Sequence, residues 1–369
     1  MGGARPSYAP TGHLVYAQAG TLMAVPFDPQ RLGVNGSPVP VLEGVLQSPS
    51  TGVAQYSFSS TGSVAYVAGI QGTRRKLVWV DRKGAEQPLP APLHSYRSPR
   101  LSPDGRRVAA VIAEQGANIW LYDLARETLT RLTFGGGNSN TPIWTPDGKR
   151  IAFNSSFGGP VHVFWQLADG SGTAESLTAG EYQHIDGSWS PDGQVLAFVE
   201  LNPVTGRDIW TLHVSGDRKP QPFLRTQFNE TAPSFSPDGR WLAYASDESG
   251  RYEIYVQPYP GPGGKWQIST EGGTEPAWGH NGEIFYRSGD KMIAVETKTQ
   301  PSFSADKPKV LFVGQYVLSL LTMANYDVSP NGQRFVMIKE DEQAATATQI
   351  NVVLNWFEEL KQKVPTGKK

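Results

Sequence analysis

The sequence predicts an all-β fold built from short strands, and three observations support this expectation. The chain of 369 residues contains 40 Gly and 29 Pro, a surplus over average usage that indicates many tight turns. Aromatic residues make up 11% of the chain and supply large apolar side chains for a core. The strongest observation is an internal repeat whose copies start 43 to 50 residues apart. That period is close to the length of one four-stranded propeller blade.

Each copy of the repeat has an apolar residue followed by a segment of the Ser-Pro-Asp-Gly type. Four copies are closely alike, with leading residues Leu101, Trp144, Trp189 and Phe235. Four weaker copies have the leading residues Tyr8, Phe58, Trp278 and Val328. Counted from the residue after the leading one, the repeats start at residues 9, 59, 102, 145, 190, 236, 279 and 329.

The residue types within a copy predict four strands. In the turn, Pro fixes φ, Asp bonds nearby backbone N–H groups and Gly accepts a positive φ. A second strand follows with apolar and small residues, as at residues 241–244, and a third follows a polar loop, as at residues 208–212. A short fourth strand ends in forms such as residues 267–269. One period therefore makes one blade of a β-propeller.

We expect residues 1–356 to form a single propeller and residues 357–369 to form a short helix and a disordered tail. Eight blades are favoured, the last one incomplete because its third strand, at residues 351–356, is followed by no fourth strand. Only eight residues precede the first copy, so we expect no exchange of a strand between the termini. Seven blades are the alternative, in which one weak copy, in particular the first, packs outside the ring.

The repeats resemble the TolB-like, WD40-like (PD40) propeller repeat of bacterial TolB and of propellers fused to peptidases and Ser/Thr kinases. The resemblance covers nearly the whole chain and implies a periplasmic or extracytoplasmic location. Residues 350–360 are also similar to the end of propellers attached to such kinases. The given sequence contains no kinase motif and no Gly-x-Ser-x-Gly nucleophile elbow.

Charge and composition exclude several classes of partner and chemistry. The formal net charge of -1 offers no general attraction to nucleic acid. The absence of Cys excludes disulfides, thiolate nucleophiles and thiolate metal sites. The given chain shows no signal-peptide pattern and no apolar run of about 18 residues, so we expect no membrane insertion. We also expect a monomer.

Ligands of propellers bind at the mouth of the central channel, where the loops entering the inner strands converge. The predicted ligand-binding residues in these loops are Arg97, Asn140, Asp186, Glu275 and Tyr326. A candidate set of oxygen and imidazole ligands for one divalent cation, Ca²⁺, Mn²⁺ or Zn²⁺, consists of His184, Asp186, Glu230 and Glu275. A solvated polar funnel without a metal is the alternative.

Two classes of function fit these residues. The favoured class is a binding module, a sensor or scaffold that uses the funnel or a rim for a peptide, a protein or a small molecule. The alternative is a metal-assisted hydrolase or lyase acting on an ester, lactone, phosphoester or uronide, with His184 and Glu230 as proton-transfer groups. The Asp residues of the turns are expected to be structural, since turn building accounts for them: Asp104, Asp147, Asp192 and Asp238.

Overall fold

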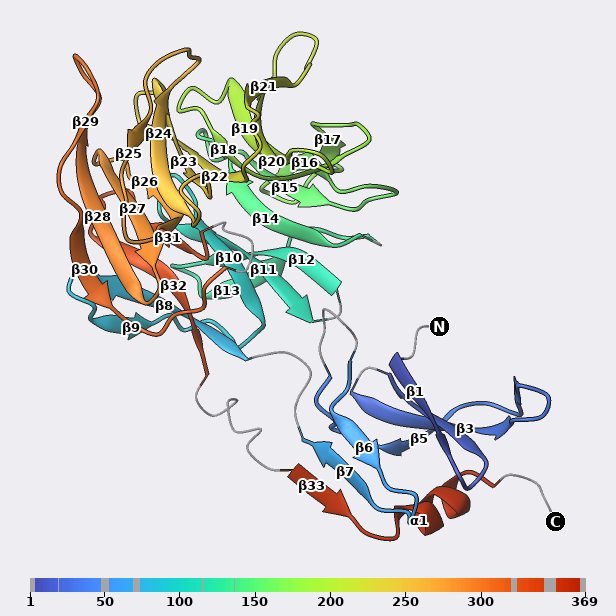
Figure 1. Ribbon diagram of the computed structural model, residues 1–369. Coiled ribbons are helices and arrows are strands. Elements are labelled where there is room, and N and C mark those ends of the chain that lie inside the picture. Colours follow the sequence, from blue (N-terminus) through green and yellow to red (C-terminus); the bar gives the residue numbers. More distant parts are fainter. Residues whose placement is uncertain are drawn as a thin grey trace. The chain divides into compact units, whose positions relative to one another are not determined.

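The computed structural model describes residues 4–18, 20–47, 53–68, 74–114, 116–135, 137–319, 324–341 and 350–365. The chain forms two compact units (Figure 1): unit 1 contains Met1–Arg74 and Glu340–Lys369, and unit 2 contains Arg75–Lys339. The predicted all-β class is confirmed, and so is the short C-terminal helix, α1 (Trp356–Lys363). Within the described residues, no helix is long and apolar enough to cross a membrane. Residues 366–369 of the predicted tail lie outside the described part.

Four sheets of unit 2 follow the repeats in order, and each has four antiparallel strands. The first contains β10 (Tyr96–Leu101), β11 (Arg107–Glu114), β12 (Gly116–Asp123) and β13 (Thr128–Arg131). The second contains β14 (Ser139–Trp144), β15 (Arg150–Ser155), β16 (His162–Leu167) and β17 (Glu175–Ser176). The third contains β18 (Gln183–Trp189), β19 (Val195–Asn202), β20 (Gly206–His213) and β21 (Gln221–Leu224). The fourth contains β22 (Glu230–Phe235), β23 (Trp241–Ser246), β24 (Glu253–Pro258) and β25 (Trp266–Gln267).

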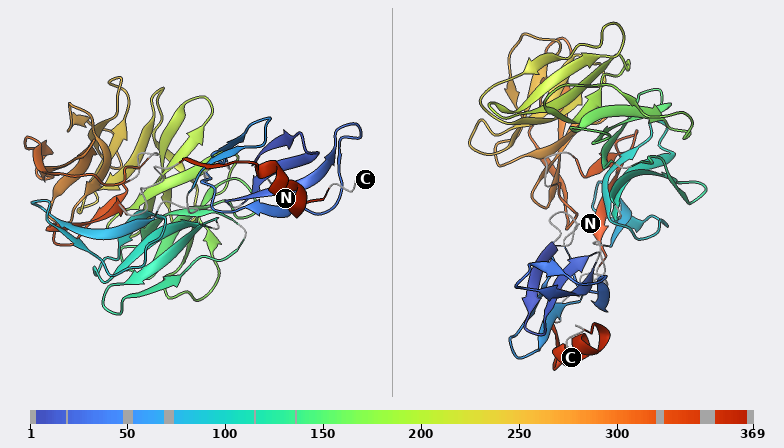
Figure 2. Two further views of the ribbon diagram at one scale, coloured as in Figure 1. Left: turned by 90° about the horizontal axis from the view of Figure 1, so that it is seen from below. Right: turned by 90° about the vertical axis from the view of Figure 1, so that its right-hand side faces the viewer.

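The fifth sheet contains β26 (Thr274–Trp278), β27 (Glu283–Ser288), β28 (Lys291–Lys298), β29 (Ser304–Ala305) and β30 (Lys309–Val313). β30 pairs with β28, so the segment between β29 and β31 adds a further strand to this sheet. The sixth sheet has the order β31 (Tyr326–Val328), β32 (Arg334–Glu340), β8 (Arg75–Asp81) and β9 (Glu86–Pro88). Figure 2 shows the sheets of unit 2 around a common centre, so the four-stranded blades predicted from the repeat are confirmed.

The sixth sheet corrects two expectations about the end of the propeller. Its third strand is β8, whereas residues 351–356 were expected in that place. Strands from the two ends of unit 2 share this sheet, so the expectation that no strand is exchanged was also wrong. The reason is that a repeat period counts copies along the chain but does not determine which sheet each strand joins.

Unit 1 holds two sheets in its described residues, one of five strands and one of three. One contains β1 (Ala4–Ala9), β2 (His13–Gln18), β3 (Thr21–Asp28), β4 (Gly33–Val34) and β5 (Val39–Leu42). The other has the order β33 (Ile350–Val353), β7 (Val64–Val67) and β6 (Tyr56–Phe58). Trp356, Phe357 and Leu360 of α1 are buried in the core of this unit. The first two repeats thus contribute strands to unit 1, a different division from one propeller over residues 1–356.

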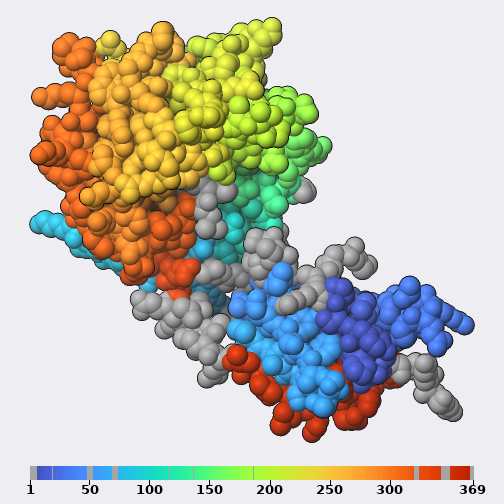
Figure 3. All heavy atoms as spheres, viewed as in Figure 1, coloured from blue at the N-terminus to red at the C-terminus, as the bar shows by residue number. Residues whose placement is uncertain are grey.

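Buried apolar side chains fill the spaces between neighbouring blades of unit 2. Ile254 of β24 and Tyr286 of β27 belong to one such cluster, and their two blades, yellow to orange, lie side by side in Figure 3. Phe285 of the fifth blade meets Phe335 of the sixth, with ring centroids 5.2 Å apart. Such edge-to-face contacts add to the stabilisation from burial, so side-chain packing joins successive blades.

The Ser-Pro-Asp-Gly turns have the structure that their residue types predict. In the second blade, the N–H of Gly148 donates to the carbonyl of Thr145 at 2.8 Å. Asp147 accepts hydrogen bonds from the Thr145 hydroxyl at 2.6 Å and from the Lys149 N–H at 3.0 Å. The hydroxyl contact holds the pKa of Asp147 below its ordinary value. Equivalent hydroxyl contacts occur at the other three turns, which confirms a structural role for Asp104, Asp192 and Asp238.

The turns also pack against one another around unit 2. At Gly239, φ is +70° and an added Cβ would lie 3.2 Å from Cδ of Pro191 in the preceding blade. Looser contacts of the same kind, at ordinary van der Waals distance, occur in three further pairs: Gly105 with Pro330, Gly148 with Pro103, and Gly193 with Pro146. Because a side chain here would meet both backbone strain and proline, the glycine of the repeat also serves contact between blades.

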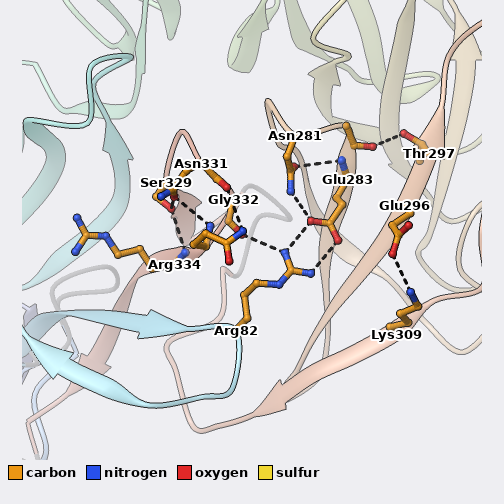
Figure 4. A network of polar contacts seen from close by, with 12 residues as sticks. Arg82, Asn281, Glu283, Glu296, Thr297, Lys309, Ser329, Asn331, Gly332 and Arg334 are labelled. Carbon is orange, nitrogen blue, oxygen red and sulfur yellow. Dashed lines mark hydrogen bonds and ion pairs between the residues drawn. The ribbon is translucent and has the colours of Figure 1, made fainter.

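Arg82 connects the closing sheet to its neighbouring blade (Figure 4). Its guanidinium donates to both carboxylate oxygens of Glu283, at 2.7 and 2.9 Å, and to the carbonyl of Gly332 at 3.1 Å. Glu283 begins β27, and Gly332 ends the turn between β31 and β32. A bidentate contact of this kind fixes geometry as well as charge. One side chain therefore links three segments that are distant in sequence.

We predict that Arg82→Ala lowers the free energy of unfolding of unit 2 by about 1–2 kcal/mol, since Glu283 loses a bidentate, partly buried partner. The free energy of unfolding of Arg82→Lys should lie between those of the wild type and Arg82→Ala, because an ammonium keeps the charge but not the paired donors. Urea unfolding of both variants is the measurement. A double-mutant cycle of Arg82→Ala, Glu283→Ala and the variant with both changes gives the coupling free energy between Arg82 and Glu283. Wild-type stability in Arg82→Ala would contradict this role.

Candidate functional site

The innermost strands of the six sheets that the described residues of unit 2 form surround a cavity of about 510 Å³. They are β10, β14, β18, β22, β26 and β31, and each contributes residues to the wall. The cavity lies where these strands lead into the repeat turns, because its wall includes five turn prolines: Pro103, Pro146, Pro191, Pro237 and Pro330.

The cavity wall combines apolar side chains with a comparable share of polar groups. Its aromatic members are Trp144, Trp189, Phe235, Trp278 and Tyr326. Its charged and titratable members are Arg100, His280 and Asp327. A concave space of this size with mixed chemistry is typical of a ligand site.

Beside this cavity, polar side chains of the inner strands accept hydrogen bonds from backbone N–H groups of a neighbouring blade. The Ser188 hydroxyl accepts from the N–H of Phe235 at 3.1 Å, and the Ser234 hydroxyl accepts from that of Trp278 at 2.9 Å. At the closing junction, Asp327 accepts from the N–H of Leu101 at 2.7 Å. Burial raises the pKa of Asp327 despite the opposing charge of Arg100. The polar groups of the wall are therefore held in place by the fold.

A bulge divides each of four inner strands into an entry end and a cavity end. The bulge contains a residue with positive φ directly before a proline: Ser98, Thr141, Ala232 and Glu275. Bulges re-aim side chains and interrupt pairing. The inner strands thus present one set of residues before the bulge and another after it.

Most of the predicted ligand-binding residues lie at the entry end. Arg97 is exposed and Asn140 is half-buried, and neither lines the cavity. Tyr326 does line it, and its hydroxyl donates to the carbonyl of Glu275 at 2.9 Å. Asp186 is part of β18, but its side chain lies outside the described residues. The predicted set and the cavity therefore share Tyr326, and the expectation of a site at the entry loops stays a prediction.

His184 is buried between two titratable neighbours at the entry end. Its Nδ1 lies 3.3 Å from Nδ1 of His162, and its Nε2 lies 3.3 Å from Oε2 of Glu200. Burial, with a smaller contribution from His162, lowers the pKa of His184 to about 4. The imidazole is therefore neutral near pH 7, with each nitrogen facing a different side chain.

Glu230 and Glu275 are buried carboxylates with different partners. The Thr226 hydroxyl donates to Oε1 of Glu230, and Oε2 has no hydrogen-bond partner among the described residues. Glu275 accepts from the N–H groups of Ser319 at 2.9 Å and Asn325 at 2.8 Å. Burial raises the pKa of Glu230 to about 7 and also raises that of Glu275. Both carboxylate oxygens of Glu275 thus accept hydrogen bonds from the backbone, whereas only one oxygen of Glu230 has a partner among the described residues.

The predicted metal ligands do not converge in the described part of the chain. No group of three or more His, Cys, Asp or Glu side chains there has an arrangement that could hold a metal ion. His184, Glu230 and Glu275 each contact their own set of neighbours. The contribution assigned to Asp186 stays a prediction.

Sequence reasoning missed Asp208, which is fully buried in β20. The Thr205 hydroxyl donates to its Oδ2, while Oδ1 has no partner within the described ranges. The residue precedes an Ile-Trp pair in the third strand of its blade. A charged residue directly before a buried Ile in a strand is a signal that could have identified it, since carboxylates are rarely buried.

These features define a β-propeller of four-stranded antiparallel blades whose inner strands enclose a cavity. The chain belongs to the PD40 family, described as the TolB beta propeller domain, whose profile matches residues 21–206, about half of the chain. The resemblance noted from the repeats is thereby confirmed.

Several curated proteins are similar to parts of this chain. The uncharacterized peptidase YuxL of Bacillus subtilis is 25% identical over 209 residues, which cover 44% of this chain and 32% of that protein. The uncharacterized protein Atu1656 of Agrobacterium fabrum is 31% identical over 170 residues, 42% of this chain and 55% of that protein. The Tol-Pal system protein TolB of Hydrogenovibrio crunogenus is 35% identical over 82 residues, 22% and 19% of the two chains. The chain thus spans about a third of YuxL and about half of Atu1656.

Solved structures show the same fold. A protein provisionally assigned as TolB from Agrobacterium tumefaciens has a TM-score of 0.59 at 18% identity, covering 73% of this chain and 98% of the other. An oligogalacturonate lyase in complex with manganese has a TM-score of 0.51 at 13% identity, covering 79% and 85%. At these identities, the similarity establishes the fold and not the activity.

We predict that Glu230 makes stability depend on pH. Its folded-state pKa of about 7 exceeds the ordinary 4.5, so the protonated carboxyl stabilises the fold below pH 4.5, and this contribution is lost as the pH rises through 7. The negative charges that oppose ionisation, after burial, belong to Asp208, Asp247 and Glu248. Glu230→Gln should remove this loss and be more stable than the wild type at about pH 8, by about 3 kcal/mol.

Urea unfolding at several pH values, in the presence of a metal chelator, measures the effect. The two proteins should have similar stability near pH 4.5 and diverge as the pH rises. Parallel profiles for wild type and Glu230→Gln over this range would show that Glu230 ionises as it does in the unfolded chain.

Proposed function

We propose that the protein is a binding module that takes a peptide segment of a partner protein, or a small molecule of similar chemistry, into the cavity of unit 2. The observation that carries this proposal is the cavity itself, about 510 Å³ in volume and bounded by all six inner strands. This volume falls within the range of about 300–1,000 Å³ that ligand pockets occupy.

The cavity wall suits a ligand with apolar groups and a few polar ones. Trp144 and Trp189 line the wall but are mostly packed between blades, whereas Trp278 is half-buried and offers apolar surface to a ligand, and such aromatic surfaces are common at binding hot spots. Arg100 and Asp327 lie on adjacent blades and supply opposite charges. A short peptide offers both apolar side chains and charged or backbone polar groups, and therefore fits this wall.

Membership of the TolB propeller family supports a binding role, for which TolB and the propellers attached to bacterial kinases are the nearest models. We further propose an extracytoplasmic location, for which the relationship to TolB is the support. A metal-assisted hydrolase or lyase stays the alternative: the lyase with manganese shares the fold, but the described residues offer no three-ligand group that favours it.

We predict that filling the cavity abolishes binding without unfolding the protein. Ala277 lines the wall and is half-buried, so Ala277→Trp places a large side chain in the space. Peptides selected from a displayed library against the wild type should bind this variant at least about tenfold more weakly, which is about 1.4 kcal/mol. Fluorescence anisotropy with the selected peptides measures the difference.

A matched control places the same side chain elsewhere. Thr173 is exposed between β16 and β17 and does not line the cavity, so Thr173→Trp should bind like the wild type. Circular dichroism checks that both variants keep their strands. Equal binding to Ala277→Trp and the wild type would move the site away from the cavity, and failure to select any peptide would remove the peptide proposal.

A further inference from the structure

Two buried carboxylates lie close together where the third blade meets the fourth. Asp208 belongs to β20 and Glu230 begins β22, and these strands are in contact. Asp208 is 0% exposed and Glu230 is 1% exposed. The N–H of Arg207 donates to Oδ1 of Asn229 at 3.3 Å, so the residues directly before Asp208 and Glu230 are in contact. Besides burial, the charge of Asp208 contributes to the raised pKa of Glu230.

Each carboxylate has one oxygen that the described part of the chain leaves without a partner. Threonine hydroxyls donate to the other oxygens, Thr205 to Asp208 and Thr226 to Glu230. The free atoms are Oδ1 of Asp208 and Oε2 of Glu230, and both are buried. Buried oxygens of this kind are rare in folded proteins because leaving them unpaired costs free energy.

Positive charge near the pair is insufficient to balance it. The cation that pairs with Asp208 is Arg225, whose Nε lies 3.8 Å from Oδ2 of Asp208 and whose side chain is 48% exposed. The neighbouring acids are engaged by other groups: Asp247 accepts from Asn229, and Glu248 pairs with Lys265. When both groups are ionised, Asp208 and Glu230 therefore carry more negative charge than Arg225 alone balances.

In two other blades, the residue that corresponds to Asp208 receives its hydrogen bonds from protein groups. The residue that precedes the buried Ile of the third strand is Asn118 in the first blade and Glu253 in the fourth. Asn118 accepts from Arg131 at 2.7 Å. Glu253 accepts from Arg251 at 2.7 Å, from the N–H of Gly272 at 2.9 Å and from the Ser269 hydroxyl. Compared with these two, Asp208 lacks a complete set of partners.

We propose that Asp208 and Glu230 bind one divalent cation of the hard, oxygen-preferring kind, Ca²⁺ above all, through Oδ1 and Oε2. Two carboxylates match the charge of the ion, and the site offers oxygen ligands without thiolate or imidazole. Such ions complete their coordination with hydroxyl or carbonyl oxygens and water, and the hydroxyls of Thr205 and Thr226 are adjacent. The ion joins two neighbouring blades.

This site differs from the set predicted from the sequence, with which it shares only Glu230. It also stands apart from the proposed binding cavity, because neither Asp208 nor Glu230 lines that cavity. The cation proposal can therefore fail or succeed without affecting the proposed function.

Calcium titration of the whole, chelator-treated protein tests the proposal. At about pH 7.5, CaCl₂ should raise the melting temperature in a concentration-dependent way, and calorimetry should give one site per chain. Asp208→Asn and Glu230→Gln should each weaken Ca²⁺ binding at least about tenfold, which is about 1.4 kcal/mol. Glu253→Gln, which removes a buried carboxylate at the same position of the next blade, should keep wild-type affinity.

Two results would overturn the proposal. One is a wild type that shows no calorimetric or thermal response to millimolar Ca²⁺, in which case a proton alone compensates the pair. The other is full Ca²⁺ affinity in both Asp208→Asn and Glu230→Gln, which would place any bound ion elsewhere. Calorimetry reads binding directly, so a change of stability in either variant does not obscure the outcome.

Discussion

The pairing of strands from the two ends of unit 2 is the constraint on which the propeller depends. β31 and β32 share a sheet with β8 and β9, so the last blade is complete only when residues about 250 positions apart meet. The chain has no Cys, and closure therefore relies on backbone hydrogen bonds and side-chain contacts. Glu86 of β9 accepts from the Tyr316 hydroxyl at 2.8 Å and pairs with Lys339 of β32 at 3.0 Å. The guanidinium carbon of Arg334 lies 3.9 Å from the ring centroid of Trp79.

Closure gives the inner strands two ends with different chemistry. After the bulges, prolines and aromatic rings enclose the cavity, a surface that favours a ligand with apolar groups. Before the bulges, His184 and Glu230 occupy equivalent positions in adjacent blades, and both are buried among other titratable groups. A propeller that binds at one end can thus use the other for an ion that holds its blades together.

The sequence predicted what is local and missed what depends on distant pairing. The turns and most strands follow from residue types within a few positions, and Asp147 has the hydrogen bonds expected of it. The place of β8 did not follow, because its partner β32 lies in the last repeat. Glu230 was identified as a site residue from its loop position, but Asp208 was passed over because the neighbouring Ile and Trp indicated only a core strand. Burial and missing partners become visible only in three dimensions.

Hydrogen exchange resolved by peptide tests the closing sheet most directly. If β8 and β9 belong to the last blade, their amides should exchange at the same rate as those of β31 and β32. All four strands should exchange as slowly as the other blades of unit 2. Arg82→Ala should then accelerate exchange in both segments together. Exchange of residues 75–88 at a rate independent of residues 326–340 would contradict the account.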